Sequence, residues 1–243
     1  MNNGYISEEL FHFVGYSSPK DDEKNYETLC KVLSAKCISH PPHDQSRGKI
    51  SYRTEWDQKL STEELIVPTV TCFADIPFDS LSVHIEKYGR FGVALPRDLL
   101  IMHGARPVMY FPLRSDDWNS LFGQTLLNDI EAIGKGFNDH VFRPLVGKGD
   151  KSRSLGVPPP SLESAISAMQ SMVLKDFLAF IKPFNSELSH NDQLNYYMER
   201  EWRKYGNMQF EKSDLTKVIV ATSYKERLEN DFPILKNRIL EIF

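Results

Sequence analysis

Two glutamates and an arginine in the last third of the chain have residue types and a spacing that suit a chemical site. Glu199, Glu201 and Arg203 alternate with other residues, so an extended strand places all three side chains on one face. Two carboxylates this close repel each other unless water, a cation or a positively charged intermediate lies between them. The alternative is a solvent-exposed edge strand whose charges prevent aggregation.

A carboxylate beneath a developing positive charge suits the breaking of a bond to an anomeric carbon. Cleavage of the nicotinamide bond of NAD passes through an oxocarbenium-like ribose, which such a carboxylate stabilises. A second carboxylate on the same face can orient an acceptor or act as its base. A retaining glycosidase is the remoter alternative, because its two carboxylates normally flank the substrate from opposite sides.

The composition is that of an ordinary globular protein. The chain has 243 residues, of which 41% are hydrophobic and 26% charged, and its net charge is −4. This charge argues against a nonspecific nucleic-acid binder. Three cysteines are too few for a disulfide framework, and we find no signal peptide or membrane span. We therefore expect a cytoplasmic location.

Other chemistries have weaker support in the sequence. Cys30, Cys37, His40 and His43 lie close together, but Cys30 falls on an apolar helical face, so we expect no metal site. The chain has no G-x-S-x-G motif of a serine hydrolase. The basic segment Gly147–Arg153 lacks P-loop spacing. It is predicted to be a solvated linker, and a phosphate or partner contact is the alternative.

The predicted elements form an α+β protein. Residues 11–15, several segments within 65–112, 196–203 and 217–222 are predicted strands. Predicted helices are marked by sets of apolar residues at helical spacing: Tyr26, Leu29, Cys30 and Leu33; Leu81, Ile85 and Tyr88; Phe122, Leu126, Ile130 and Ile133; Leu162, Ile166, Met169, Val173, Phe177 and Phe180; and, closing the chain, Phe232, Leu235, Ile239 and Ile242. We expect a single domain over 1–243. Its β-rich body comprises about 1–112 and 191–243, and a helical insertion covers about 113–190.

Several motifs together resemble a known family. They are Val70–Phe78, His84–Val93, Gly104–Tyr110, His12–Gly15 and Glu199–Arg203. They resemble the AbiGi family of abortive-infection, phage-resistance proteins. The layout is also similar to ADP-ribosyltransferase-like enzymes, including the DarT group that modifies DNA. This resemblance implies a split mixed β-sheet body with a helical insertion.

The resemblance also implies roles for individual residues in an NAD site. Glu201 would be the catalytic carboxylate and Glu199 its helper. The cofactor would be contacted by His12, Gly15, Tyr52, Arg53, Phe73 and Asp75, with His12 at the adenosine-side ribose and Tyr52 or Phe73 beside nicotinamide. The residues also allow plainer roles: His12 as a satisfied strand histidine, Asp75 as a turn residue, Phe73 as core and Arg53 as a surface charge.

Two functions remain open from the sequence. The first is an NAD-dependent ADP-ribosyltransferase-like toxin of an anti-phage system, which modifies a nucleic acid or a protein; an NAD glycohydrolase is a variant of it. The second is a catalytically inactive antitoxin or interaction module that binds a cognate partner. Fold-level analogy does not decide between them.

Overall fold

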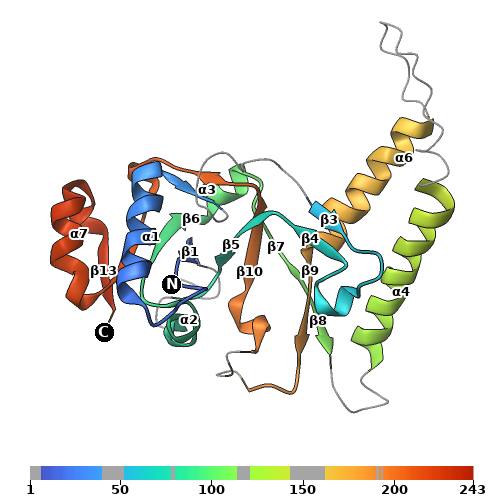
Figure 1. The fold of residues 1–243 in the computed structure, drawn as a ribbon, viewed down its shortest axis with the longest axis horizontal. Helices are drawn as coiled ribbons and strands as arrows, with labels where there is room; N and C mark the ends of the chain where they lie inside the picture. Colours follow the sequence, from blue (N-terminus) through green and yellow to red (C-terminus); the bar gives the residue numbers. More distant parts are fainter. Residues whose placement is uncertain are drawn as a thin grey trace, which may run out of the picture. The chain divides into compact units, whose positions relative to one another are not determined.

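The chain divides into two compact units. The computed structural model describes residues 7–39, 52–77, 80–113, 121–142, 162–189, 192 and 194–242. The first unit comprises Met1–Ser51, Thr69–Val108 and Glu187–Phe243, and the second comprises Tyr52–Pro68 and Met109–Ser186 (Figure 1). The prediction of a mixed α and β protein is confirmed. The ADP-ribosyltransferase-like arrangement of its parts stays a prediction.

A mixed seven-stranded sheet forms the centre of the first unit. Its strand order is β13-β12-β6-β1-β5-β10-β7. The strands are β1 (Glu9–Phe13), β5 (Val70–Ala74), β6 (Gly92–Pro96), β7 (Arg106–Pro107), β10 (Glu201–Tyr205), β12 (Lys217–Ala221) and β13 (Ile239–Ile242). β12 and β13 are parallel, and the other neighbouring pairs are antiparallel.

Helices cover both faces of this sheet (Figure 1). They are α1 (Asp22–Ala35), α2 (Ser82–Tyr88), α3 (Arg97–Met102) and α7 (Lys225–Asp231). The unit also contains the 3₁₀ turns η8 (Tyr196–Glu199), η9 (Lys212–Asp214), η10 (Thr222–Tyr224) and η11 (Pro233–Arg238). A separate two-stranded sheet pairs β2 (Cys37–Ile38) with β11 (Met208–Gln209). Tyr26, Leu29 and Leu33 of α1 pack with Phe73 and Val93 on one face. Leu81 packs with Phe11 and Ala74 on the other, where Ile85 and Tyr88 of α2 join them. The first unit therefore has two apolar layers.

The predicted closing helix is wrong. Phe232 ends α7 as its C-cap, Leu235 lies in η11, and Ile239 begins β13. Val218 pairs with Ile239 in the parallel ladder to β12. The short run Ile239–Ile242, with three aliphatic residues and Glu241, suits a strand as well as a helix, and here pairing with β12 selects the strand.

The second unit contains strands as well as helices. Its elements are β3 (Tyr52–Thr54), η2 (Leu60–Thr62), β4 (Ile66–Pro68), β8 (Met109–Leu113), α4 (Leu121–Phe137), the π-helical η5 (Asn138–Phe142), α6 (Leu162–Ser171), η6 (Met172–Phe177), η7 (Leu178–Phe180) and β9 (Ile181–Asn185). β3 and β4 pair antiparallel, and β8 and β9 pair parallel. The unit has other bounds than the helical insertion predicted at 113–190. It consists of two segments, Tyr52–Pro68 and Met109–Ser186.

The polar residues of α4 hold the helix to the segment before β4. Glu131 accepts hydrogen bonds from the Leu60 amide at 2.9 Å and from the Lys135 ammonium at 2.7 Å. Lys135 also donates to the Gln58 carbonyl at 3.3 Å. Burial raises the pKa of Glu131, but the bonds from Lys135 and Leu60 outweigh it and lower this pKa below its usual value.

This lowered pKa predicts a pH dependence of stability. The ionised Glu131 stabilises the fold above the unfolded-state pKa, and that contribution is lost as the pH falls through the lowered folded-state pKa. We expect Glu131→Gln to reduce stability at about pH 7 and to have a smaller effect at about pH 3. Urea unfolding at both pH values measures this difference. An equal loss at both would mean that the carboxylate charge contributes nothing.

No helix among the described residues is both long enough and apolar enough to span a membrane.

Candidate functional site

Glu201 and Arg203 form a buried ion pair on β10. The Arg203 Nε donates to Glu201 Oε1 at 2.7 Å, and the two residues are 5% and 8% exposed. Glu201 lies opposite Ala74 and Arg203 opposite Cys72 on β5, so both point to the face that α2 covers. β10 lies between β5 and β7. The solvent-exposed edge strand is therefore wrong for this segment.

Glu199 lies on a different element from Glu201. It ends η8, and Arg200 follows in a left-handed conformation with φ of 43°. Of the strand predicted over 196–203, only 201–203 are extended, as the start of β10, and Tyr196–Glu199 form the turn η8 instead. Glu199 is nevertheless buried. Its Oε1 accepts hydrogen bonds from Lys87 Nζ and from the Tyr88 hydroxyl, each at 2.5 Å.

Tyr88 and Lys87 bring α2 to this carboxylate. Burial, followed by the charge of Glu199 and the hydrogen bond to it, raises the pKa of Tyr88 far above its ordinary value. Its phenol therefore stays protonated and donates. The Lys87 ammonium also lies 4.0 Å from the centre of the Tyr196 ring, a cation–π contact that fixes η8 to α2.

The arrangement balances its own charges. Glu199 pairs with Lys87, and Glu201 pairs with Arg203. We call these four residues and Tyr88 the ion-paired cluster. The two carboxylates do not need an external cation or a cationic intermediate to be stable side by side, because each has a cation of its own. The repulsion that suggested chemistry at this pair is therefore already relieved by Lys87 and Arg203.

Asp75 braces the turn that separates the two glutamates. Its backbone amide donates to the Arg200 carbonyl at 3.2 Å, and its Oδ2 lies 3.3 Å from the Arg200 guanidinium. The second oxygen, Oδ1, is buried without a hydrogen-bond partner in the part of the chain that the structure describes. Both of these Asp75 contacts therefore go to Arg200, not to the turn at Ile76-Pro77 that its position suggested.

His12 and Phe73 lie on the opposite face of the sheet from Glu201. Phe73 is opposite Trp202, the residue after Glu201, and it is 2% exposed in the core beneath α1. His12 pairs with Val93 of the same layer. Its ring lies 5.8 Å from that of Phe73, and its Nδ1 donates to the Cys72 carbonyl at 2.9 Å. The structure does not bring His12, Phe73 and Glu201 together on one surface.

Gly15 is required by close packing at the end of β1. A Cβ atom at this position would lie 2.2 Å from the Tyr88 carbonyl oxygen and 2.8 Å from Asn25 Nδ2. The glycine therefore lets the chain pass the C-terminus of α2, directly behind the ion-paired cluster.

Tyr52 and Arg53 belong to the second unit. They form β3, and Arg53 makes an exposed ion pair with Glu55 at 2.5 Å. They are not part of the ion-paired cluster of the first unit. The roles predicted for them, for His12, Gly15, Phe73 and Asp75 in NAD binding, and for Glu199 and Glu201 in catalysis, stay predictions.

Lys87 and Tyr88 were not predicted from the sequence as partners of Glu199. They stand 112 and 111 positions before it, and no local spacing relates them. One indication was available in the sequence. Lys87 and Tyr88 are adjacent polar residues at the end of a short amphipathic helix, and Tyr88 lies on its apolar face, where a hydroxyl needs a buried partner.

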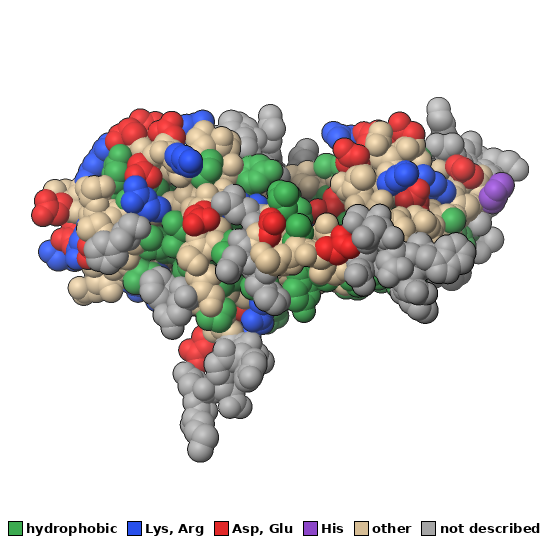
Figure 2. Space-filling model, turned by 90° about the horizontal axis from the view of Figure 1, so that it is seen from below, with side chains coloured by type: hydrophobic (Ala, Val, Ile, Leu, Met, Phe, Trp, Pro, Cys, Tyr) green, Lys and Arg blue, Asp and Glu red, His purple; other side chains and the backbone are tan. Residues whose placement is uncertain are grey.

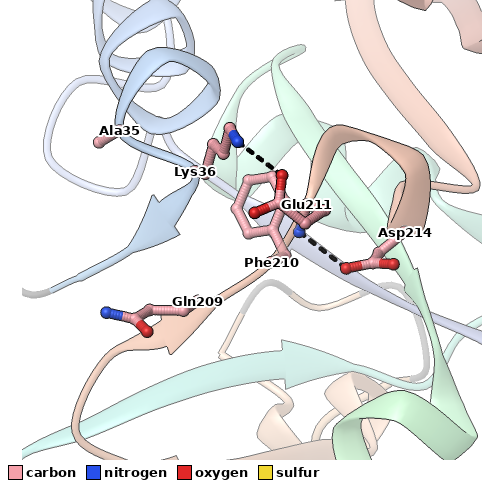
Figure 3. A pocket seen from close by; sticks show the side chains of 6 residues that line it. All are labelled: Ala35, Lys36, Gln209, Phe210, Glu211 and Asp214. Atoms are coloured by element: carbon pink, nitrogen blue, oxygen red, sulfur yellow. Dashed lines mark hydrogen bonds and ion pairs between the residues drawn. The ribbon is translucent and has the colours of Figure 1, made fainter.

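Two pockets lie elsewhere in the first unit. One, of about 380 Å³, lies at the C-terminal end of α1 and is lined by Ala35, Lys36, Gln209, Phe210, Glu211 and Asp214. In it Lys36 pairs with Glu211 at 2.5 Å, and Asp214 accepts from the Glu211 amide at 2.7 Å (Figure 3). The other, of about 550 Å³, is lined by Pro19, Lys20, Asp22, Ile85, Glu86 and Arg90. Neither pocket is lined by Glu199 or Glu201.

Charges on the visible surface are interspersed. On the face that Figure 2 shows, Lys and Arg side chains lie beside Asp and Glu side chains. Within the described ranges, no group of three or more His, Cys, Asp or Glu residues is placed to hold a metal. His40, His43 and the basic segment Gly147–Arg153 lie outside the described residues.

The geometry defines a mixed α/β protein with a buried, charge-balanced cluster beneath α2. The chain belongs to the AbiGi family, whose model, described as "Putative abortive phage resistance protein AbiGi, antitoxin", matches residues 45–241. No curated protein matches the chain, and no solved structure matches it either.

The family corrects the first of the two functions expected from the sequence. The AbiGi description says antitoxin, whereas the first expectation was an ADP-ribosyltransferase-like toxin. That expectation is wrong, and the finding favours the alternative, an antitoxin or interaction module. The resemblance to the AbiGi family itself is confirmed.

Proposed function

We propose that this chain is the antitoxin of an abortive-infection toxin–antitoxin pair and that it acts by binding its cognate toxin. The match to the AbiGi family over residues 45–241 carries the proposal. An antitoxin family implies a toxin partner, and binding is the simplest way for one protein to neutralise another.

The ion-paired cluster supports binding over catalysis. Glu199 and Glu201 are about as buried as core residues and are held by Lys87 and Arg203. A buried carboxylate with a fixed cation is expected to keep η8, α2 and β10 in one arrangement rather than to meet a substrate. In this proposal the cluster is a structural support of the first unit.

Enzyme activity and NAD as a ligand stay predictions beside this proposal. Calorimetric titration of NAD into the purified chain tests the ligand directly. Saturable binding that Glu201→Gln abolishes, in a variant shown to be folded, would revive the NAD prediction. No heat of binding would leave the antitoxin proposal unchanged.

Growth of cells that produce both members of the pair tests the proposal. The product of the neighbouring gene is induced alone, together with this chain, or together with an unrelated protein of similar size. We expect growth arrest in the first and third cultures and growth in the second, and the chain produced alone should be harmless. Toxicity of this chain by itself, or arrest in all three cultures, would contradict the proposal.

A further inference from the structure

The side of helix α4 that packs on its own unit includes two glycines. Gly123, Leu127 and Gly134 are its buried residues among those whose side chains the structure describes. A Cβ atom on Gly123 would lie 1.7 Å from the Pro112 carbonyl oxygen of β8, and one on Gly134 would lie 3.6 Å from the Leu178 side chain. Gly123 therefore lets the helix approach β8 closely, whereas a side chain at Gly134 would make only an ordinary contact with η7.

The large apolar residues of α4 point outward instead. Leu126, Ile133 and Phe137 are 47%, 58% and 40% exposed, and Ile130 is half-buried. Leu126 and Ile133, two of the residues that predicted this helix, therefore lie away from its buried side. We call Leu126, Ile130, Ile133 and Phe137 the α4 stripe. They follow one another at intervals of four, three and four residues, which is the spacing of a coiled-coil seam.

The border of the α4 stripe also differs from an ordinary solvated helix face. Thr125, Asp129, Ala132 and Gly136 run parallel to it with the same spacing, and three of them are exposed. All are short, and a Cβ atom on Gly136 would meet nothing within 4 Å. The charged residues Glu131 and Lys135 do not border the α4 stripe, because they face the unit itself and hydrogen-bond to the Leu60 amide and the Gln58 carbonyl. A second helix can therefore come close to the stripe.

We propose that the α4 stripe is the docking site for an amphipathic helix of the cognate toxin, with basic residues beside its apolar seam. This inference rests on the proposed function, since it assigns the surface by which the antitoxin binds. The apolar side chains would supply the buried centre of the interface. Asp129 is the charge on the outer border, and a Lys or Arg of the incoming helix complements it.

The same border disfavours a second copy of this chain as the occupant. A second α4 helix would bring no cation to Asp129, whereas a basic partner helix would. The only cation of α4, Lys135, is bound to Glu131 at 2.7 Å. Charge therefore favours a basic partner helix over self-association.

Exposed-residue substitutions test the docking site without touching the core. Ile133→Asp places a charge in the middle of the α4 stripe, and Ile234→Asp is the matched control, because Ile234 is a 76% exposed isoleucine of the first unit. Binding of the purified neighbouring-gene product to each variant is measured by calorimetry, and folding by circular dichroism. We expect Ile133→Asp to weaken binding about tenfold or more and Ile234→Asp to leave it unchanged.

Asp129→Lys tests the charge of the partner helix. It should weaken binding several-fold, with a larger effect at low salt. Equal binding by wild type, Ile133→Asp and Asp129→Lys would overturn the docking site while leaving the antitoxin proposal intact. A wild-type dimer in light scattering that Ile133→Asp converts to monomer would show a second copy as the occupant and overturn the inference. Failure of the wild type to bind or to restore growth would instead contradict the proposed function.

Discussion

Arg203→Met is expected to lower the free energy of unfolding by about 3–5 kcal/mol. Arg203 and Glu201 are 8% and 5% exposed, and their bond is 2.7 Å long. Removing the guanidinium leaves the Glu201 carboxylate buried without its cation, which costs more than the ion pair itself contributes. Urea unfolding followed by circular dichroism measures the change.

The double variant Glu201→Gln/Arg203→Met separates a lost ion pair from lost volume. Since it removes both charges and keeps side chains of similar size, its stability should return most of the way to that of the wild type. A single variant Arg203→Met as stable as the wild type would mean that the pair is not buried in solution. Glu201→Gln alone should also destabilise, because it leaves Arg203 with a weaker acceptor.

Gly15→Ala is expected to lower the free energy of unfolding by about 2–3 kcal/mol. The added methyl group would lie 2.2 Å from the Tyr88 carbonyl oxygen, and that backbone can yield only if the end of α2 shifts. Such a shift also disturbs the bonds of Lys87 and Tyr88 to Glu199. Thermal unfolding monitored with the intrinsic fluorescence of the chain detects both effects.

Gly136→Ala is the matched control for Gly15→Ala. Gly136 lies in α4, and an added Cβ meets nothing within 4 Å, so the substitution should stabilise by up to about 1 kcal/mol through helix propensity. If both glycine variants changed stability by the same amount, the close approach of β1 and α2 would not be the cause.

The sequence predicted elements that rest on local patterns. The strand around His12, the helix with Tyr26, Leu29 and Leu33, and the strand at 217–222 all occur, as β1, α1 and β12. The apolar residues of α1 are buried at the helical period, whereas the apolar residues of β12 are buried without interruption, on both faces of the sheet. The local sequence suffices there, because the same residues decide both the element and its burial.

Elements whose form depends on distant partners were not predicted. Arg200 adopts a left-handed conformation next to Asp75, so Glu199 and Glu201 do not share a strand. The side of α4 that packs on its unit includes Gly123, which lies against Pro112. Counting the apolar residues of the helix cannot reveal this side. Tertiary contacts therefore override the local pattern at these points.

The candidate site shows the same division. The repulsion between Glu199 and Glu201 was recognised from the sequence, but not their burial or the cation that each carboxylate has, Lys87 of α2 for Glu199 and Arg203 for Glu201. Alternation along β5 and β10 places Phe73 and Glu201 on opposite faces, and this depends on strand register, which the sequence does not fix.

Growth restoration by Glu201→Gln/Arg203→Met tests most directly whether the chain acts by binding. This variant removes the carboxylate on which an NAD-cleaving mechanism would depend, and the structure predicts that it stays folded. Cells producing it with the neighbouring-gene product should grow as well as cells producing the wild-type chain. A folded variant that binds the toxin as the wild type does but fails to restore growth would contradict the account, because neutralisation would then require the carboxylate itself.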